Sequence, residues 1–361
     1  METLITGGTG LVGHHLITRL QQRGDTVRAL VLPSENTSWL EERGVTIYRG
    51  DVRDPDTLTA PMRSVDTVFH LAAMQGLWLP IEEYYKVNVA GTENVCRAAL
   101  QAGARRIVHV SSWTIYGMDS GWPLTEEVTP APRNDPYWIT KAQGDLLVQR
   151  MIDKDHLPAT IIRPGTIFGV GDRLNFGRTA DKVRAGKGLV LGSGRNFLPL
   201  VYVTDVIQGL LLCANHDRAQ GQAFNITNDQ PLTQGEFLQA IAQDLGAAPP
   251  RLHIPYAAAY ALAYAAERAV KFTGAKHPLV TRHGVTLYGT DNRHSIDKAR
   301  TELGYEPQVG IREGVQLACA WYRENFMPES NGLSAASLAS DTHSTNREDI
   351  LTPHAHPAPT A

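Results

Sequence analysis

The chain has 361 residues, which is enough for one large domain or for a main domain with a smaller lobe. Hydrophobic residues make up 42% and charged residues 20% of it, as expected for a protein with a sizeable packed core. The net charge of −3 argues against a nucleic-acid-binding protein, and the longest apolar helical run, Ala257–Ala266, is too short to span a bilayer.

The first half of the chain alternates short β-rich runs with longer helical patterns, which predicts a parallel, doubly wound α/β sheet. Helices are expected at Leu11–Arg23 and Ile81–Ala102, and a third begins at Pro136. The expected strands are Thr3–Thr6, Thr26–Leu32, Thr46–Tyr48, Thr67–His70, Ile107–Ser111 and Ala159–Ile162.

The pattern changes after about residue 165, where glycine and proline separate fewer regular elements. Two later segments still resemble core elements of the predicted sheet, namely Val201–Ala214 and Ala223–Thr227. The remaining residues of 166–327 are predicted to form a smaller second lobe. Residues 328–361 lack apolar periodicity and are rich in Ser, Thr, Ala and Pro, which predicts a disordered tail.

Three glycines, Gly7, Gly10 and Gly13, lie between the first expected strand and the first helix. Glycine lets the backbone turn sharply and approach a pyrophosphate, whose charge then lies on helix N–H groups without partners. An ordinary tight turn would have similar glycines, and the spacing differs slightly from the commonest G-x-G-x-x-G. The strand before and the helix after favour a dinucleotide site, so residues 1–165 are predicted to bind NAD(P).

Tyr137 and Lys141 lie four residues apart, so they project from the same helix face. A nearby ammonium and an oxidised nicotinamide ring would lower the pKa of Tyr137, which then suits general acid–base catalysis. Ser112, at the end of an expected strand, is placed to hydrogen-bond the substrate oxygen. The spacing alone would also fit a solvated helix pair.

These segments together resemble the extended short-chain dehydrogenase/reductase family, from residue 2 to about 325. The matching segments are Thr6–Gly13, Gly50-Asp51-Val52, His70–Ala73, Val87–Thr92, Ser111-Ser112, Tyr137 with Lys141, and Arg163–Asp172. The fold that the resemblance implies is a Rossmann-type sheet with a smaller C-terminal substrate-binding lobe.

The resemblance also implies roles for individual residues. Tyr137 would donate or accept the proton, Lys141 would bind the ribose hydroxyls next to the nicotinamide, and Ser112 would polarise the substrate oxygen. Asn88 is expected to hold neighbouring backbone. The implied cofactor-binding residues are Gly7, Gly10, Leu11, Val12, Gly13, Asp51, Val52, Leu71, Ala72, Ala73, Tyr137, Lys141 and Pro164.

The choice between NAD and NADP depends on the end of the second expected strand. An acid there would bond the 2′-hydroxyl of NAD and repel the 2′-phosphate of NADP. This strand ends at Val31-Leu32 without an acid, and relatives often have arginine in place of Leu32. The side chains of Ser34 and Asn36 could hydrogen-bond either the 2′-hydroxyl or the 2′-phosphate. Glu35 is expected to point to solvent. The cofactor is thus NAD(P), with a preference for NADP.

The family includes nucleotide-sugar epimerases and dehydratases as well as dehydrogenases of steroids and other alcohols. In the first group an arginine just before the strand that matches Leu200–Val203 binds the diphosphate. In this chain Leu198 and Pro199 occupy the position of that arginine, and Arg195 lies a few residues before it. Other segments are similar to 3β-hydroxysteroid dehydrogenase-like proteins, among them Gly221–Ile226 and Lys298–Pro307.

The sequence therefore predicts an NAD(P)-dependent enzyme that interconverts an alcohol and a ketone on a mainly apolar substrate. The alternatives are a nucleotide-sugar epimerase or dehydratase and a non-catalytic NAD(P)-binding regulator. Tyr256, Tyr260 and Tyr264 form a helical stripe, which is expected to pack on the sheet. A wall of an apolar pocket, to which Trp78 would also belong, or a contact with a membrane surface are the other interpretations of the stripe.

The expected environment is a reducing cytoplasm, because the cysteines lie far apart and are predicted to be buried thiols. No metal site is expected, since His14 and His15 are adjacent and do not share a helix face. The expected partners are a small-molecule substrate and, in a homodimer, a second copy of the chain. The cysteines are Cys96, Cys213 and Cys319.

Overall fold

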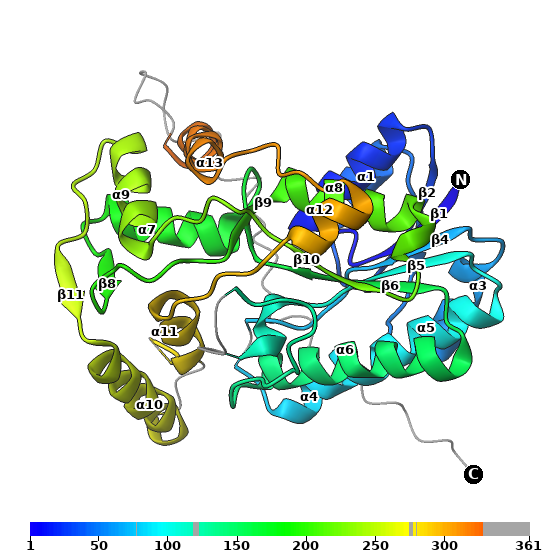
Figure 1. Cartoon of the computed structure of the whole chain (residues 1–361), viewed down its shortest axis with the longest axis horizontal. Coiled ribbons are helices and arrows are strands. Elements are labelled where there is room, and N and C mark those ends of the chain that lie inside the picture. Colours follow the sequence, from blue (N-terminus) through cyan, green and yellow to red (C-terminus); the bar gives the residue numbers. More distant parts are fainter. Residues whose placement is uncertain (77, 118–122, 274–276, 279, 328–361) are drawn as a thin grey trace, which may run out of the picture.

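The structure is a computed structural model that describes residues 1–76, 78–117, 123–273, 277–278 and 280–327, with the backbone alone for 271–273. The predicted tail, 328–361, lies outside the described residues. The larger part of the molecule is a sheet of seven parallel strands in the order β10-β6-β5-β4-β1-β2-β3 (Figure 1). These strands are β1 (Glu2–Thr6), β2 (Thr26–Val31), β3 (Thr46–Arg49), β4 (Thr67–His70), β5 (Arg106–Val110), β6 (Ala159–Pro164) and β10 (Ala223–Ile226).

The strand order reverses between β1 and β4, so the loops that follow these two strands diverge at the carboxyl edge of the sheet. Ligands of open α/β sheets bind at such a point. The predicted Rossmann-type, doubly wound sheet is confirmed, and the strand boundaries differ from the predicted ones by at most two residues.

Helices cover both faces of the sheet (Figure 1). Alternate residues of each strand point to opposite faces, so Ile5 and Phe69 pack with α1 and α8, whereas Leu4 and Val68 pack with α5 and α6. The helices are α1 (Leu11–Gln22), α2 (Ser38–Glu42), α3 (Thr59–Met62), α4 (Ile81–Tyr85), α5 (Thr92–Gln101), α6 (Pro136–Asp155), α7 (Arg178–Arg184), α8 (Val203–Asn215), α9 (Gln234–Asp244), α10 (Tyr256–Thr273), α11 (Arg282–Gly289), α12 (Asp297–Leu303) and α13 (Ile311–Phe326).

The helix that was predicted over Ile81–Ala102 is interrupted by a π-helical segment, Lys86–Gly91, between α4 and α5. Within it the Asn88 side chain accepts from Met74 N at 2.8 Å and donates to Met74 O at 3.0 Å. Asn88 also donates to Thr140 Oγ1 of α6 at 3.0 Å. As expected, Asn88 holds neighbouring backbone, and the wider helical turn lets it bind the loop after β4 and α6 together.

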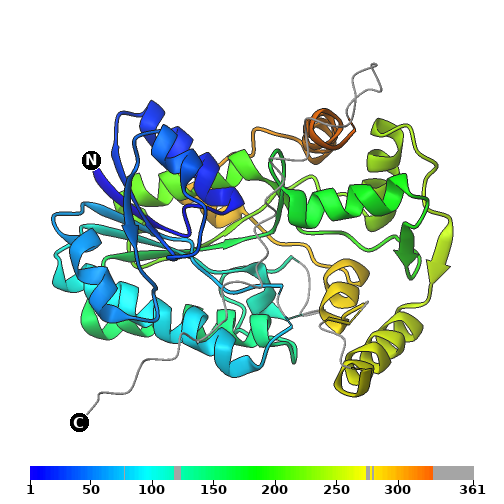
Figure 2. The same cartoon turned by 180° about the vertical axis from the view of Figure 1, so that it is seen from behind.

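The smaller part of the molecule lies beside the sheet and contains α7, α9, α10, α11 and α13 (Figures 1 and 2). Between 166 and 254 it also contains two short parallel strand pairs, β7 (Thr166–Phe168) with β9 (Leu200–Tyr202) and β8 (Leu189–Leu191) with β11 (Leu252–Ile254). The chain returns to the sheet for α8 and β10, as predicted for Val201–Ala214 and Ala223–Thr227.

The tyrosine stripe of α10 does not pack on the sheet, so that prediction was wrong. α10 lies at the outer end of the smaller part and contacts α11 (Figure 2). Its buried apolar residues in the described part are Ala259 and Ala263, because small alanine side chains let α10 lie close against α11. Tyr260 and Tyr264 each come one residue later, about 100° around the helix, and are 38% and 44% exposed.

Candidate active site

The loop after β1 has the close packing that requires glycine. Gly7 has φ +75°, and a Cβ there would lie 2.9 Å from Ala72 N. A Cβ at Gly13 would lie 2.6 Å from Gly7 O. Helix α1 then begins after Gly10 without a side-chain cap, so its first N–H groups face the cleft as an anion site. These residues fit a dinucleotide pyrophosphate.

One continuous cleft follows the carboxyl edge of the sheet. Every residue that the sequence assigned to the cofactor or to catalysis lines it, from Gly7 and Asp51 to Ala72, Ser112 and Pro164. The structure therefore brings together all the predicted site residues, although they come from the loops after several different strands.

Helix α6 places Tyr137 and Lys141 at this edge. Asp135 caps the helix, because its Oδ1 accepts from Tyr137 N at 3.0 Å and from Trp138 N at 3.2 Å. Pro136 follows at the first helical position, where its missing N–H costs nothing. The cap fixes the start of the helix and thereby the direction of the Tyr137 side chain.

Ser112 interacts with both Thr114 and Tyr137. Its Oγ accepts from Thr114 N at 3.2 Å and from Thr114 Oγ1 at 2.9 Å, which occupies its acceptor positions. The hydroxyl of Ser112 hydrogen-bonds Tyr137. Thr114 was not among the predicted site residues, although a threonine two residues after the serine is the available signal.

Burial is the largest effect on the pKa of the Tyr137 hydroxyl. Burial raises it, and the hydrogen bond from Ser112 offsets part of that increase. The nearby carboxylate of Asp135 raises it further, and Lys141 Nζ donates to Val110 O at 2.7 Å. Burial also lowers the pKa of Lys141 to about 8, against the opposing effect of Asp145.

Two buried histidines lie beneath Lys141 on neighbouring strands. His70 Nδ1 is 2.8 Å from Thr6 Oγ1, and His70 Nε2 is 3.1 Å from Thr92 Oγ1. The ring of His109 lies 5.3 Å from that of His70. Burial and the nearby Lys141 lower the pKa of His70 to about 3 and that of His109 well below its ordinary value. Both rings are neutral.

The end of β2 differs from the prediction for Glu35. This side chain does not point away into solvent: its Oε2 accepts from Leu32 N at 2.9 Å, and it lines the cleft. The turn after β2 brings the carboxylate back to the strand end, where an acid was thought to be missing. The number of residues between the end of the strand and Glu35 gave no indication of this turn.

His283 of α11 is a further cleft residue that the sequence analysis missed. Trp138 Nε1 donates to His283 Nδ1 at 3.1 Å, and the His283 ring lies 6.2 Å from that of Tyr137. Trp138 and His283 are 145 residues apart in the chain, so no local pattern could indicate their contact. His283 lines the same cleft as Tyr137.

Arg195, the arginine considered for a sugar-nucleotide diphosphate, is exposed and does not line the cleft. Leu198 and Pro199 are buried. Arg178 at the start of α7 lines the cleft instead.

Within the described residues, no helix is long and apolar enough to cross a membrane. That same part of the chain contains no group of three histidine, cysteine or acidic side chains that would hold a metal ion. The cysteines are free and buried, as predicted, and burial raises the pKa of the Cys96 thiol to about 12.

The chain is similar to known proteins over most of its length. The model of the NAD dependent epimerase/dehydratase family matches residues 3–227. The chain is 32% identical over 343 residues to 3beta-hydroxysteroid-dehydrogenase/decarboxylase isoform 1 of Arabidopsis thaliana, with 87% of this chain and 77% of the relative covered. It is 32% identical over 326 residues to sterol-4-alpha-carboxylate 3-dehydrogenase, decarboxylating, of Mus musculus, with 86% and 88% covered.

Among solved structures, the crystal structure of gox2253 matches with a TM-score of 0.76 at 31% identity and covers 90% of this chain and 98% of that one. The resemblance to the extended short-chain dehydrogenases/reductases is thereby confirmed, and the chain belongs to the NAD dependent epimerase/dehydratase family.

Proposed function

We propose that the chain is an NAD(P)-dependent oxidoreductase that interconverts a secondary alcohol and a ketone on a mainly apolar substrate. The observation that supports this most directly is the meeting of Ser112, Tyr137 and Lys141 in the cleft that begins at the glycine loop. A regulator that only binds a cofactor has no need of a serine hydroxyl aimed at a tyrosine.

In the oxidative direction, Tyr137 Oη removes the proton from the substrate hydroxyl. When bound, the oxidised cofactor would supply the acceptor for the hydride on the carbinol carbon, so that the alcohol loses two electrons and two hydrogens in all. Ser112 Oγ–H donates to the substrate oxygen, and Lys141 binds the ribose hydroxyls. Reduction reverses each transfer, and Tyr137 Oη then donates the proton.

Apolar side chains along the cleft favour an apolar substrate. Trp78, Leu174, Leu287 and Tyr260 line the cleft, and the first two are exposed in it. The two relatives named above are described as acting on hydroxysteroids and sterol carboxylates, which supports a hydrophobic alcohol of that kind here.

A nucleotide-sugar epimerase is the main alternative, and cofactor turnover separates the two. An oxidoreductase accumulates reduced cofactor with an alcohol, whereas an epimerase returns the hydride and shows no net change. We expect steroid-like or long-chain secondary alcohols to produce reduced cofactor, measured by its absorbance, and UDP not to inhibit. Saturable inhibition by UDP that Arg178→Ala abolishes would contradict the proposal, because a buried diphosphate needs cationic partners.

We further propose that the enzyme uses NAD. The preference for NADP depended on a missing acid at the end of β2, and the carboxylate of Glu35 lies at that place. Its Oε1 is available to the 2′-hydroxyl of NAD, while its charge would repel a 2′-phosphate.

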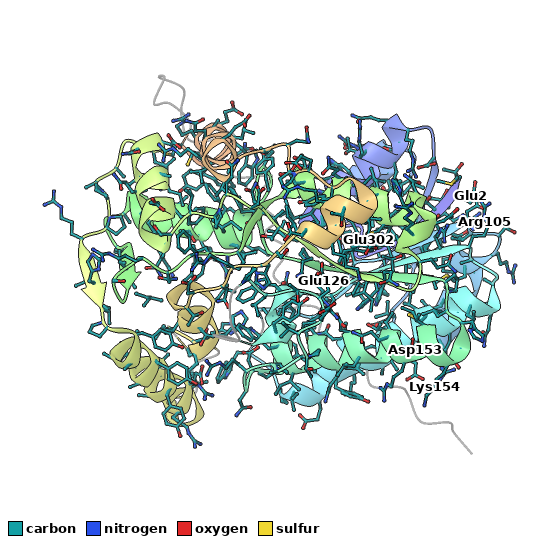
Figure 3. All side chains as sticks on the ribbon, in the orientation of Figure 1. Glu2, Arg105, Glu126, Asp153, Lys154 and Glu302 are labelled. Carbon is teal, nitrogen blue, oxygen red and sulfur yellow. The ribbon has the colours of Figure 1, made fainter. Side chains whose placement is uncertain are left out.

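Glu35→Gln is expected to weaken NADH binding and to improve NADPH binding, each by roughly 10-fold, because a charge-assisted hydrogen bond and a repulsion are lost. Titration calorimetry measures both dissociation constants. Glu302→Gln is the matched control, since Glu302 lies on α12 and does not line the cleft (Figure 3). An unchanged ratio of the two constants would show that Glu35 does not select the cofactor.

A reducing, cytoplasmic location is proposed from the buried, unpaired thiols of the three cysteines.

A further inference from the structure

Each member of the serine–tyrosine pair is followed in the chain by a buried tryptophan. Trp113 follows Ser112, and Trp138 follows Tyr137. Trp138 is fully buried and Trp113 is 2% exposed. Their rings meet edge to face with the ring centres 5.4 Å apart. This contact joins the short helical turn Trp113–Tyr116 to the first turn of α6, so the elements that carry Ser112 and Tyr137 pack against each other through the two tryptophans.

The indole N–H groups of the two tryptophans bind other walls of the cleft. Trp113 Nε1 donates to Thr166 Oγ1 at 3.2 Å, in the segment that follows β6. Trp138 Nε1 donates to His283 Nδ1 at 3.1 Å, in α11 of the smaller part. Both acceptor residues line the cleft. A buried indole N–H requires such an acceptor, because an unsatisfied donor costs its full desolvation. The tryptophans therefore connect the first turn of α6 both to the sheet and to the smaller part.

Helix α11 contacts this pair with two side chains. His283 meets Trp138 edge to face, with the ring centres 6.1 Å apart, and Leu287 packs against the two tryptophans. The two residues are four apart and share one face of α11. Asp135 Oδ1 also lies 3.4 Å from His283 Nδ1, but it already accepts two backbone N–H bonds, so Trp138 is the donor to this nitrogen.

Neighbouring residues of a helix turn together, so the packing of Trp138 determines where Tyr137 points. The Asp135 cap fixes the residue at which α6 begins, and the buried ring of Trp138 fixes how the first turn is rotated. A hydrogen bond weakens steeply as its angle becomes unfavourable. A small rotation of this turn is therefore enough to weaken the hydrogen bond between Tyr137 and Ser112.

We propose that Trp138 is a positioning residue, through which the contact of α11 with α6 maintains the hydrogen bond between Ser112 and Tyr137. This inference rests on the proposed function and adds to it a residue that acts through Tyr137. The bond from Trp138 to His283 is the link, because it is the point at which the smaller part holds the first turn of α6. The wall that α11 contributes to the cleft and the acid–base pair are thus assembled together.

The test compares Trp138→Phe, His283→Leu and the variant with both changes, in the full chain with NAD and a long-chain secondary alcohol. Trp138→Phe keeps an apolar ring and removes the N–H group, whereas His283→Leu removes the acceptor. Each is expected to lower kcat by roughly 3- to 10-fold, the factor that a hydrogen bond of ordinary strength supplies, with little change in KM. Because both changes break the same bond, the double variant should lose less than the product of the two losses. His283→Gln should restore most of kcat, since an amide oxygen can accept from Trp138.

The pH dependence of kcat separates positioning from a general loss of stability. Burial raises the pKa of Tyr137 and the hydrogen bond with Ser112 lowers it. Oxidation needs deprotonated Tyr137, so kcat rises with pH toward this pKa, and weakening of the bond should shift the profile to higher pH. A partly unfolded variant would instead lose rate at every pH. Asp135 and His283 also titrate near Tyr137, and an equal shift in His283→Leu excludes the imidazole as its cause.

His253→Gln is the control, because His253 is exposed on β11 and does not line the cleft. It should leave kcat, KM and the pH profile unchanged. Melting temperature and NAD binding of each variant show that it is folded. An unchanged kcat in Trp138→Phe, losses that multiply in the double variant, or a loss without a shift of the profile would each overturn the inference, while leaving the proposed function intact. If the wild-type chain reduced no cofactor with any alcohol, the proposed function itself would fail.

Discussion

Tyr137→Phe is expected to lower kcat by roughly 10²- to 10⁴-fold, which is the usual contribution of general acid–base catalysis. The substitution removes only the hydroxyl. The ring stays in place, because the Asp135 cap and the edge-to-face contact with His283 do not involve Tyr137 Oη. Lys141 is also unaffected, since its ammonium is bound to Val110 O. Cofactor affinity should therefore remain unchanged.

The measurement is the initial rate with a saturating alcohol, together with calorimetric titration of the cofactor. Tyr85→Phe serves as the control, because Tyr85 is exposed and does not line the cleft. If Tyr137→Phe retained more than about a tenth of the wild-type rate, another group would have to move the proton.

The second large effect is a loss of stability in mild acid. Burial lowers the pKa of His70 and His294 to about 3 and that of His109 well below its ordinary value. Between those values and the ordinary pKa, the unfolded chain binds protons at these three rings and the folded chain does not. Stability is therefore present above about pH 6.5 and falls as the pH drops below it.

The expected loss between about pH 7 and pH 5.5 is about 1.3 kcal/mol for each histidine, or about 4 kcal/mol for the three. Urea unfolding at a series of pH values measures it. Buried acids change in the opposite sense, because burial raises the pKa of Glu126, Asp172 and Asp205. A comparison between variants separates the histidines from these acids.

His294→Gln should decrease the slope of unfolding free energy against pH by about 1.4 kcal/mol per pH unit near pH 5.5, which corresponds to one proton. His253→Gln should not change the slope, as this side chain is exposed. Equal slopes for wild type and His294→Gln would mean that His294 accepts a proton in the folded state.

The sheet and the glycine loop could be predicted because their signals are local. Within a few residues the chain has a strand, glycines such as Gly13 where the backbone packs closely, and an amphipathic helix. The same holds for Tyr137 and Lys141, whose spacing of four defines a shared face. These motifs placed every predicted site residue in one cleft.

The features that were missed depend on contacts between distant segments or on turns. Alanines and tyrosines of α10 both repeat every four residues, and only the position of α11 determines that Ala263 is buried and Tyr264 exposed. The raised pKa of Tyr137 follows from its burial and, to a smaller extent, from the nearby carboxylate of Asp135. The carboxylate of Glu35 contacts the end of β2 through a turn that the sequence does not predict.

The pairing of β6 with β10 has a consequence for synthesis on the ribosome. Residues Ala223–Ile226 complete the sheet, yet they follow a long excursion of the chain through the smaller part. Until they emerge, β6 is an edge strand with unpaired N–H and C=O groups, and α8 does not yet cover Val108 and Ile162. A nascent chain that ends near residue 165 is thus an incomplete, aggregation-prone intermediate, even though its sequence resembles a finished nucleotide-binding module.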